Sequence, residues 1–145
     1  MTADRGETLI ELLVSVTILG LAGVALISSL STAVVVSDVQ RKQTTAGATV
    51  RNYAEAIENA VVTNGYQASC TPVYAAGFTP PAGISAPQVT AVSFWTGSAF
   101  PPVCDAGTDR GAQRLTLQAS SVDGRATERL TIVVRNPCGP GTSCL

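Results

Sequence analysis

Residues 5–15 read RGETLIELLVS, and after this stretch the chain carries no charged residue until Asp38. A short polar leader that ends in Gly6 therefore runs directly into an apolar segment. Glu11 is the unusual residue, because it lies just inside the front edge of that segment. An ionisable side chain in hydrocarbon costs about 2.5–3.5 kcal/mol on insertion scales, so its presence implies a partner group.

The apolar segment is long enough to cross a membrane. Leu12 to Val36 is a continuous stretch of apolar or small residues, and a membrane-spanning helix needs about 20 of them. A cleaved secretory signal has a basic start and an apolar core of about 7–15 residues. Here the core is longer, and three acidic residues outweigh Arg5. A plain signal anchor is the remaining alternative, but it leaves Glu11 without a role.

Arg5-Gly6, followed by Thr8-Leu9-Ile10-Glu11-Leu12-Leu13, resembles the start of type IV pilins and pseudopilins. In that family a membrane peptidase cuts after the glycine and methylates the new amino terminus, and the glutamate guides helical assembly. The resemblance implies cleavage between Gly6 and Glu7, N-methylation of Glu7 and an assembly role for Glu11. The first mature residue of the family is usually phenylalanine or methionine, so Glu7 suggests a minor rather than a major subunit.

Cleavage would create a partner for Glu11, since it leaves a cationic amine on Glu7 in an apolar bundle. A carboxylate and an ammonium attract strongly at low dielectric, while either one left alone is penalised. Pairing with the amine of an adjacent subunit would set the axial register between neighbouring helices. The alternative is pairing within one chain, because positions four residues apart share a helix face.

Beyond Val36 the pattern becomes amphipathic without a strong helix breaker. Between Ser37 and Val62 the apolar residues follow the three-and-four spacing of one helical face: Val50, Tyr53, Ala54, Ile57 and Val61. Asn64-Gly65 predicts the carboxyl-terminal cap, because glycine adopts the left-handed conformation at little cost. The sequence therefore predicts one long helix over residues 7–63, with about residues 9–36 in the membrane.

The rest of the chain, residues 64–145, is rich in turns and predicts a small β-rich globular head. Gln88–Phe94 alternates loosely and predicts a strand. Residues 113–121 and 125–135 alternate clearly, and Asp123-Gly124 between them is a strong hairpin signal. Centring the turn there places Leu115 opposite Ile132 and Leu117 opposite Leu130. The expected fold is α+β and pilin-like, with the long helix packed on an antiparallel sheet and residues 1–6 as a leader.

Four cysteines predict disulfides in a head of this size. Small domains bury little surface and often need covalent links, and a chain with a membrane anchor can form them outside the cytoplasm. Three pairings are possible. The short loop between Cys138 and Cys144 favours that pair, which leaves Cys70 with Cys104. Zinc is disfavoured, because no close C-x-x-C spacing is present.

The sequence favours no catalytic function and no cofactor. It contains no histidine, no nucleophile elbow and no phosphate-binding glycine loop. Asp105 and Asp109 offer few ligands for calcium, so solvated loop acids are favoured and no metal site is predicted. The head contains five arginines, Arg110, Arg114, Arg125, Arg129 and Arg135. Four nearby acidic residues nearly cancel them, so a solvated sheet face is favoured over a nucleic-acid site.

Three classes of function follow. The leading one is a structural subunit, a minor pilin of a bacterial type IV pilus or a related filament. The second is a pseudopilin of a type II secretion or competence DNA-uptake machine. The third is a membrane-anchored surface-binding domain that never polymerises. The first two imply prepilin peptidase and other pilin subunits as partners. They also imply a single-pass inner-membrane protein before assembly, an extracytoplasmic head, and a cell-surface filament afterwards.

Overall fold

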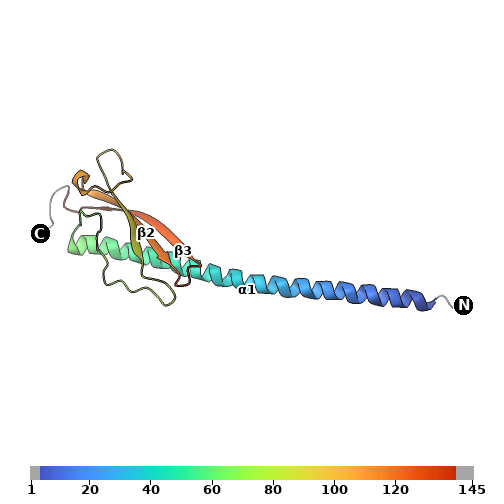
Figure 1. Cartoon of the computed structure of the whole chain (residues 1–145). Helices are drawn as coiled ribbons and strands as arrows, with labels where there is room; N and C mark the ends of the chain where they lie inside the picture. Colours follow the sequence, from blue (N-terminus) through green and yellow to red (C-terminus); the bar gives the residue numbers. More distant parts are fainter. Residues whose placement is uncertain (1–3, 140–145) are drawn as a thin grey trace. The chain divides into compact units, whose positions relative to one another are not determined.

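The computed structural model describes residues 4–139, and at residues 4–8 and 64 it describes the backbone alone. The chain divides into two compact units, Met1–Gln40 and Arg41–Leu145, and each is described by itself. The elements follow in the order α1 (Asp4–Asn64), β1 (Gln88–Phe94), the short 3-10 helix η1 (Ala106–Thr108), β2 (Ala112–Ser120) and β3 (Thr127–Arg135) (Figure 1).

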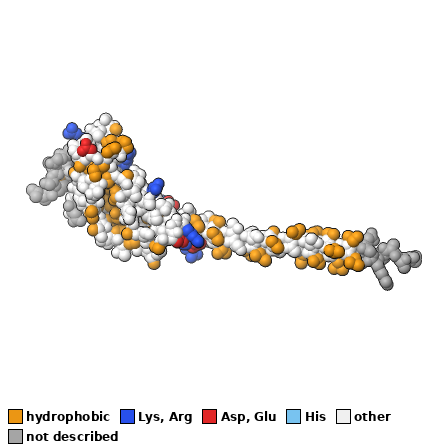
Figure 2. Space-filling model, viewed as in Figure 1, with side chains coloured by type: hydrophobic (Ala, Val, Ile, Leu, Met, Phe, Trp, Pro, Cys, Tyr) orange, Lys and Arg blue, Asp and Glu red, His pale blue; other side chains and the backbone are white. Residues whose placement is uncertain are grey.

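The described part of the Met1–Gln40 unit is helical throughout. Its apolar side chains point outward on every side of α1, as Figure 2 shows for one face. A helix that is apolar all round requires an apolar environment on all sides. The chain itself does not cover the apolar surface of this part of α1. Lipid or other helices must therefore cover that surface.

In the Arg41–Leu145 unit, α1 becomes amphipathic and buries one face. Ala46, Val50, Ala54, Ile57 and Val61 are each at most 6% exposed, at the three-and-four spacing of one helical stripe. The helix ends at Asn64, and the next residue is a glycine with φ of 89°. A left-handed residue directly after a helix satisfies its last carbonyl groups, and glycine adopts that conformation without a Cβ clash. The predicted cap is confirmed.

Three antiparallel strands form one sheet in the order β1-β2-β3. Leu115 lies opposite Ile132 and Leu117 opposite Leu130, so the predicted register of the hairpin is confirmed. β1 coincides with the predicted strand and pairs with β2 in antiparallel orientation. The register of this pairing shifts between Val89 and Ala91. The register follows from the sequence because a slip of one residue would turn every apolar side chain to the opposite face.

The core lies between this sheet and the buried stripe of α1. Leu115, Leu117 and Phe94 are fully buried, and they belong to one apolar cluster with the helix residues Val50 and Ile57. Side chains alternate between the two faces of a strand, so the intervening residues of β2 and β3 lie on the outer face. The expected α+β class, one long helix with a small antiparallel sheet, is confirmed.

Candidate functional site

The amino-terminal half of α1 exposes a continuous apolar surface. Its large apolar side chains are between 47% and 78% exposed: Leu9, Ile10, Leu12, Leu13, Val14, Val16, Ile18, Leu19, Leu21, Val24, Leu26, Ile27, Leu30, Val34, Val35 and Val36. Soluble monomers rarely expose contiguous apolar patches larger than a few hundred Å². By length and composition, α1 is the single helix in the described chain that could cross a membrane.

Five hydroxyl groups within this segment are satisfied by the helix itself, those of Thr17, Ser28, Ser29, Ser31 and Thr32. Ser28 donates to the carbonyl oxygen of Val24 at 2.9 Å, and Ser31 donates to that of Ile27 at 3.1 Å. Thr17 makes the same bond to the carbonyl of Leu13. Unsatisfied polar groups are costly in hydrocarbon, so these internal bonds make the segment compatible with a membrane or with a dry helical bundle.

Glu11 is the one charged side chain between residues 9 and 36. It is exposed, and within residues 4–139 its carboxylate makes no hydrogen bond or ion pair. Glu7 lies four residues earlier in α1, so the two positions share one face of the helix. Gly6 precedes Glu7 near the start of the same helix. The backbone thus places the predicted cleavage position one turn before the unpartnered carboxylate.

Residues 1–35 match the family model described as the prokaryotic N-terminal methylation motif. The chain carries the amino-terminal signature of type IV pilins and pseudopilins. The match covers the predicted leader, Gly6, Glu7, Glu11 and nearly all of the exposed apolar segment. Neither a curated protein nor a solved structure matches this pilin-like chain. The pilin signature therefore rests on the amino-terminal segment, and the β-rich part must be interpreted from its own geometry.

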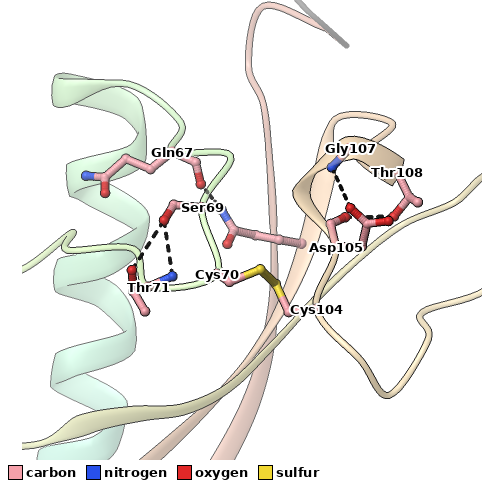
Figure 3. Close-up of a disulfide and its surroundings, with 9 residues drawn as sticks. Gln67, Ser69, Cys70, Thr71, Cys104, Asp105, Gly107 and Thr108 are labelled. Carbon is pink, nitrogen blue, oxygen red and sulfur yellow. Dashed lines mark hydrogen bonds between the residues drawn. A yellow bond between two sulfur atoms is a disulfide. The ribbon is translucent and has the colours of Figure 1, made fainter.

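A disulfide joins Cys70 and Cys104, whose Cα atoms are 5.8 Å apart (Figure 3). It links the segment after α1 to the loop before η1, across 34 positions of sequence. The predicted pairing of Cys70 with Cys104 is thereby confirmed. Cys138 is also disulfide-bonded, while Cys144, its predicted partner, lies outside the described residues. Such links restrict the unfolded chain and stabilise small domains.

Local hydrogen bonds hold both sides of the disulfide. The amide of Thr71 donates to the hydroxyl oxygen of Ser69 at 3.1 Å. On the other side, Asp105 caps η1 by accepting from the amide of Gly107 at 3.0 Å, as Figure 3 shows. Asp109 accepts in the same way from backbone amides at the start of β2. The two acids considered for calcium therefore each satisfy the backbone of this loop.

A buried polar network fixes the chain directly after α1, and no sequence pattern indicated it. The Tyr74 hydroxyl accepts from the amide of Gln67 at 2.9 Å and donates to the carbonyl of the same residue. Gln113, which is fully buried in β2, donates its amide to both the Gln67 carbonyl and the Tyr74 hydroxyl. Burial raises the pKa of Tyr74, while these bonds oppose that shift. The network joins the loop to the sheet.

One ion pair joins α1 to the turn of the β2–β3 hairpin. The Lys42 ammonium lies 2.6 Å from a carboxylate oxygen of Asp123, and the Ser121 hydroxyl donates to the other oxygen at 2.7 Å. The hydrogen bond from Lys42, followed by that from Ser121, holds the pKa of Asp123 well below its usual value of 3.8. Sequence reasoning missed this pair, because its members are 81 residues apart.

Proposed function

We propose that this protein is a minor pilin, a structural subunit of a bacterial type IV pilus or a related filament. In this proposal prepilin peptidase removes residues 1–6, and the amine of Glu7 is methylated. Residues 7–63 then form the assembly helix and residues 64–145 the head. The observation that carries the proposal is the methylation-motif match at residues 1–35, together with an unpartnered glutamate in an exposed apolar helix.

The chemistry of assembly follows from the position of Glu11. Cleavage after Gly6 leaves a cationic amine on Glu7 near an apolar surface. In the membrane, Glu11 can bond the amine of its own chain, since the two share a helix face. In the filament, Glu11 instead bonds the amine of an adjacent subunit. Two charges at low dielectric attract strongly and are costly when unpaired, so the pair would fix how far one helix slides along another.

The apolar surface of α1 has a partner at both stages of this proposal. Before assembly, lipid covers residues 9–36, and the protein is a single-pass protein of the inner membrane. After assembly, the helices of other subunits replace lipid. The disulfides support an extracytoplasmic head, because such bonds persist in oxidising compartments and are rare in the cytoplasm. The filament would then stand at the cell surface.

A second candidate uses the same parts. In a pseudopilin of a type II secretion or competence machine, the processed helix would assemble into a short filament that moves cargo. The exposed apolar helix and Glu11 favour both candidates equally, and no feature of the head within residues 65–139 separates them. In the third candidate, a surface domain that never polymerises, Glu11 would have no partner to meet. The unpartnered carboxylate favours the two assembling candidates.

Replacing Glu11 by glutamine tests the proposal. Glu11→Gln removes the charge and keeps the size and most of the hydrogen-bonding capacity of the side chain. We expect normal insertion and normal cleavage, since neither step requires the pair between subunits. Incorporation into sheared filaments, measured by immunoblot, should fall strongly. Losing one member of a buried pair leaves the other charge uncompensated, at a cost of about 3–5 kcal/mol.

Glu7→Gln is the matched control, because it makes the same change one turn earlier, at the start of the helix. Its effect on incorporation should be much milder. If Glu11→Gln entered filaments at the level of the unmodified protein, Glu11 would have no assembly role. The chain would then be better described as a membrane anchor with a surface domain.

A further inference from the structure

Three arginines lie on the outer face of the sheet, away from the core, and a fourth lies in the loop just before β2. The first three follow the strand pairing. Arg114 of β2 lies opposite Val133. On β3, Arg135 lies opposite Ala112 and Arg129 lies opposite Gln118. Their neighbours along β2, including Leu115 and Leu117, are buried on the other face, so alternation places these arginines outside. The fourth, Arg110, lines a cleft together with Arg135. We name this set the arginine strip: Arg110, Arg114, Arg129 and Arg135.

The acidic residues that balance these arginines in the sequence contact other groups in the structure. Asp105 and Asp109 accept hydrogen bonds from backbone amides in their loop. Asp123 pairs with Lys42. Glu128 lies opposite Ala119, on the side of the sheet that faces α1. Within residues 4–139 no carboxylate forms an ion pair with any member of the arginine strip.

The net charge of the whole chain conceals this separation. Residues 41–145 contain eight basic and six acidic residues, and the acid excess of the full chain comes from residues 1–40. The Arg41–Leu145 unit is therefore weakly basic, and half of its basic residues belong to the arginine strip. The strip is thus a positive surface on a chain whose formal charge is −1.

An aromatic cleft lies at one end of the strip. Its volume is about 560 Å³, and its lining includes Trp95, Phe100, Arg110, Val133 and Arg135. The rings of Trp95 and Phe100 are 5.1 Å apart at a tilt of 51°. The cleft therefore combines flat aromatic surface with two exposed guanidinium groups.

The guanidinium of Arg114 also takes part in this arrangement. Its central carbon lies 5.2 Å from the centroid of the Phe100 ring, and it donates to the carbonyl of the same residue at 3.4 Å. A cation over a ring face is attracted by the ring's quadrupole. The contact joins Arg114 to Phe100, which lines the cleft beside Trp95.

We propose that the arginine strip and the Trp95–Phe100 cleft bind single-stranded nucleic acid. Grooves that bind single strands combine a positive track for the phosphates with aromatic rings on which bases stack. Along the paired strands, Arg135 and Arg114 lie one alternate step apart, about 6.6–6.8 Å, and Arg129 lies two such steps further on. The strip therefore offers a series of cations that follows the strand direction. Guanidinium groups suit phosphate because their planar donors can bind two oxygens at once.

The aromatic pair is what favours a nucleic acid over other polyanions. Acidic polysaccharides offer carboxylate or sulfate groups to the arginines, but they have no flat bases to stack on Trp95 and Phe100. Duplex DNA hides its bases from such a cleft. The surface lies wholly within residues 95–135, so this proposal stands or falls independently of cleavage, methylation and filament assembly.

Trp95 is the chain's one tryptophan, so its fluorescence reports directly on the cleft. Purified full-length protein in detergent is titrated at low salt with a single-stranded oligothymidylate about 20 nucleotides long. We expect saturable quenching of the Trp95 emission, with an affinity that falls steeply as salt is added. Arg110→Gln combined with Arg135→Gln should weaken binding at least tenfold, and Arg110→Lys with Arg135→Lys should restore part of it.

The matched control is Arg51→Gln with Arg125→Gln, which removes the same charge from positions outside the strip. It should change the affinity by less than twofold. Circular dichroism of all variants checks that each is folded. Absence of quenching, equal loss in the control, tighter binding of an acidic polysaccharide, or equally tight binding of free thymidine monophosphate would each overturn the proposal.

Discussion

The Tyr74 hydroxyl connects three parts of the chain. It bonds both backbone groups of Gln67, directly after α1, and it accepts from the side chain of Gln113 in β2. Tyr74 is 7% exposed and Gln113 is fully buried. Buried polar groups that lose their partner cost more than the bond itself contributes. The hydroxyl is therefore expected to matter far more than its size suggests.

Tyr74→Phe should destabilise the head by about 1–3 kcal/mol, because it leaves the amide of Gln67 without a partner and removes one of the two acceptors of the buried Gln113 amide. Urea unfolding of the full chain in detergent, followed by Trp95 fluorescence, measures this loss. Tyr53→Phe is the matched control. Tyr53 packs against Phe78 with ring centroids 5.2 Å apart, and no described hydrogen bond involves its hydroxyl. Equal effects of the two changes would contradict the role of the network.

The hairpin is the element that the sequence predicts best. Two alternating segments meet at Asp123-Gly124, and a single register brings both apolar faces together. The turn glycine has φ of 71°, but Asp123 has no positive φ, so the two-residue turn that Asp-Gly predicts does not form. The Ser121 amide bonds the Ala126 carbonyl, and the Gly124 amide bonds the Ser121 carbonyl, so the loop is longer while its centre is the predicted one. The helical stripe and its cap were predicted for similar reasons, since the spacing of apolar residues and the position of a glycine are local signals.

Contacts between distant elements were not predictable in this way. Lys42 and Asp123 are 81 residues apart, and Gln113 and Tyr74 are 39 apart. No local pattern specifies which exposed lysine meets which turn. The same limit applies to the charges of the sheet. Arginines and acids lie close together in the sequence, but in the fold three acids lie in loops with other partners, and Glu128 lies on the face of the sheet opposite to the arginines.

The pair of Lys42 and Asp123 predicts a pH dependence. The pKa of Asp123 is lowered in the folded state, so the unfolded chain binds the proton more readily. The stabilisation is therefore complete above about pH 5 and is lost as the pH falls through 3.8 and below. Asp123→Asn should lower Tm by roughly 1–4 °C at pH 7, since an exposed ion pair contributes little.

The difference between Asp123→Asn and the unmodified protein should shrink steadily as the pH is lowered from 5 to 2. Thermal unfolding across that range measures it. Glu55→Gln removes a charge of the same sign from an exposed position of α1, and it should leave Tm nearly unchanged. A difference that stayed constant with pH would assign the loss to packing at the turn instead.

At the scale of the whole molecule, the two units depend on different sources of stability. The Met1–Gln40 unit buries no apolar surface within the membrane-length window of its helix. The Arg41–Leu145 unit has its own core and a disulfide. The sequence predicted both properties from composition and length. Four cysteines allow three pairings, and the sequence favoured Cys70 with Cys104 only through the short loop between the other two, whereas the folded geometry places Cys70 and Cys104 together.

Removing the Cys70–Cys104 link should destabilise the head by about 2–5 kcal/mol, because the unfolded chain regains the freedom that the link removes. The double variant Cys70→Ser with Cys104→Ser is compared with the unmodified protein by urea unfolding. Thiol labelling of the unfolded, non-reduced protein should find no free cysteine. Four free thiols would contradict both the disulfides and the extracytoplasmic head.

Processing at Gly6 is the step on which the proposed function depends. Intact-mass measurement of protein extracted from the membrane tests it directly, with Gly6→Leu as the control that should keep its full length. The mass should correspond to a chain that begins at Glu7 and carries one added methyl group. A mass equal to that of residues 1–145 in the unmodified protein, or normal shortening of Gly6→Leu, would contradict the assignment of this chain as a processed pilin subunit.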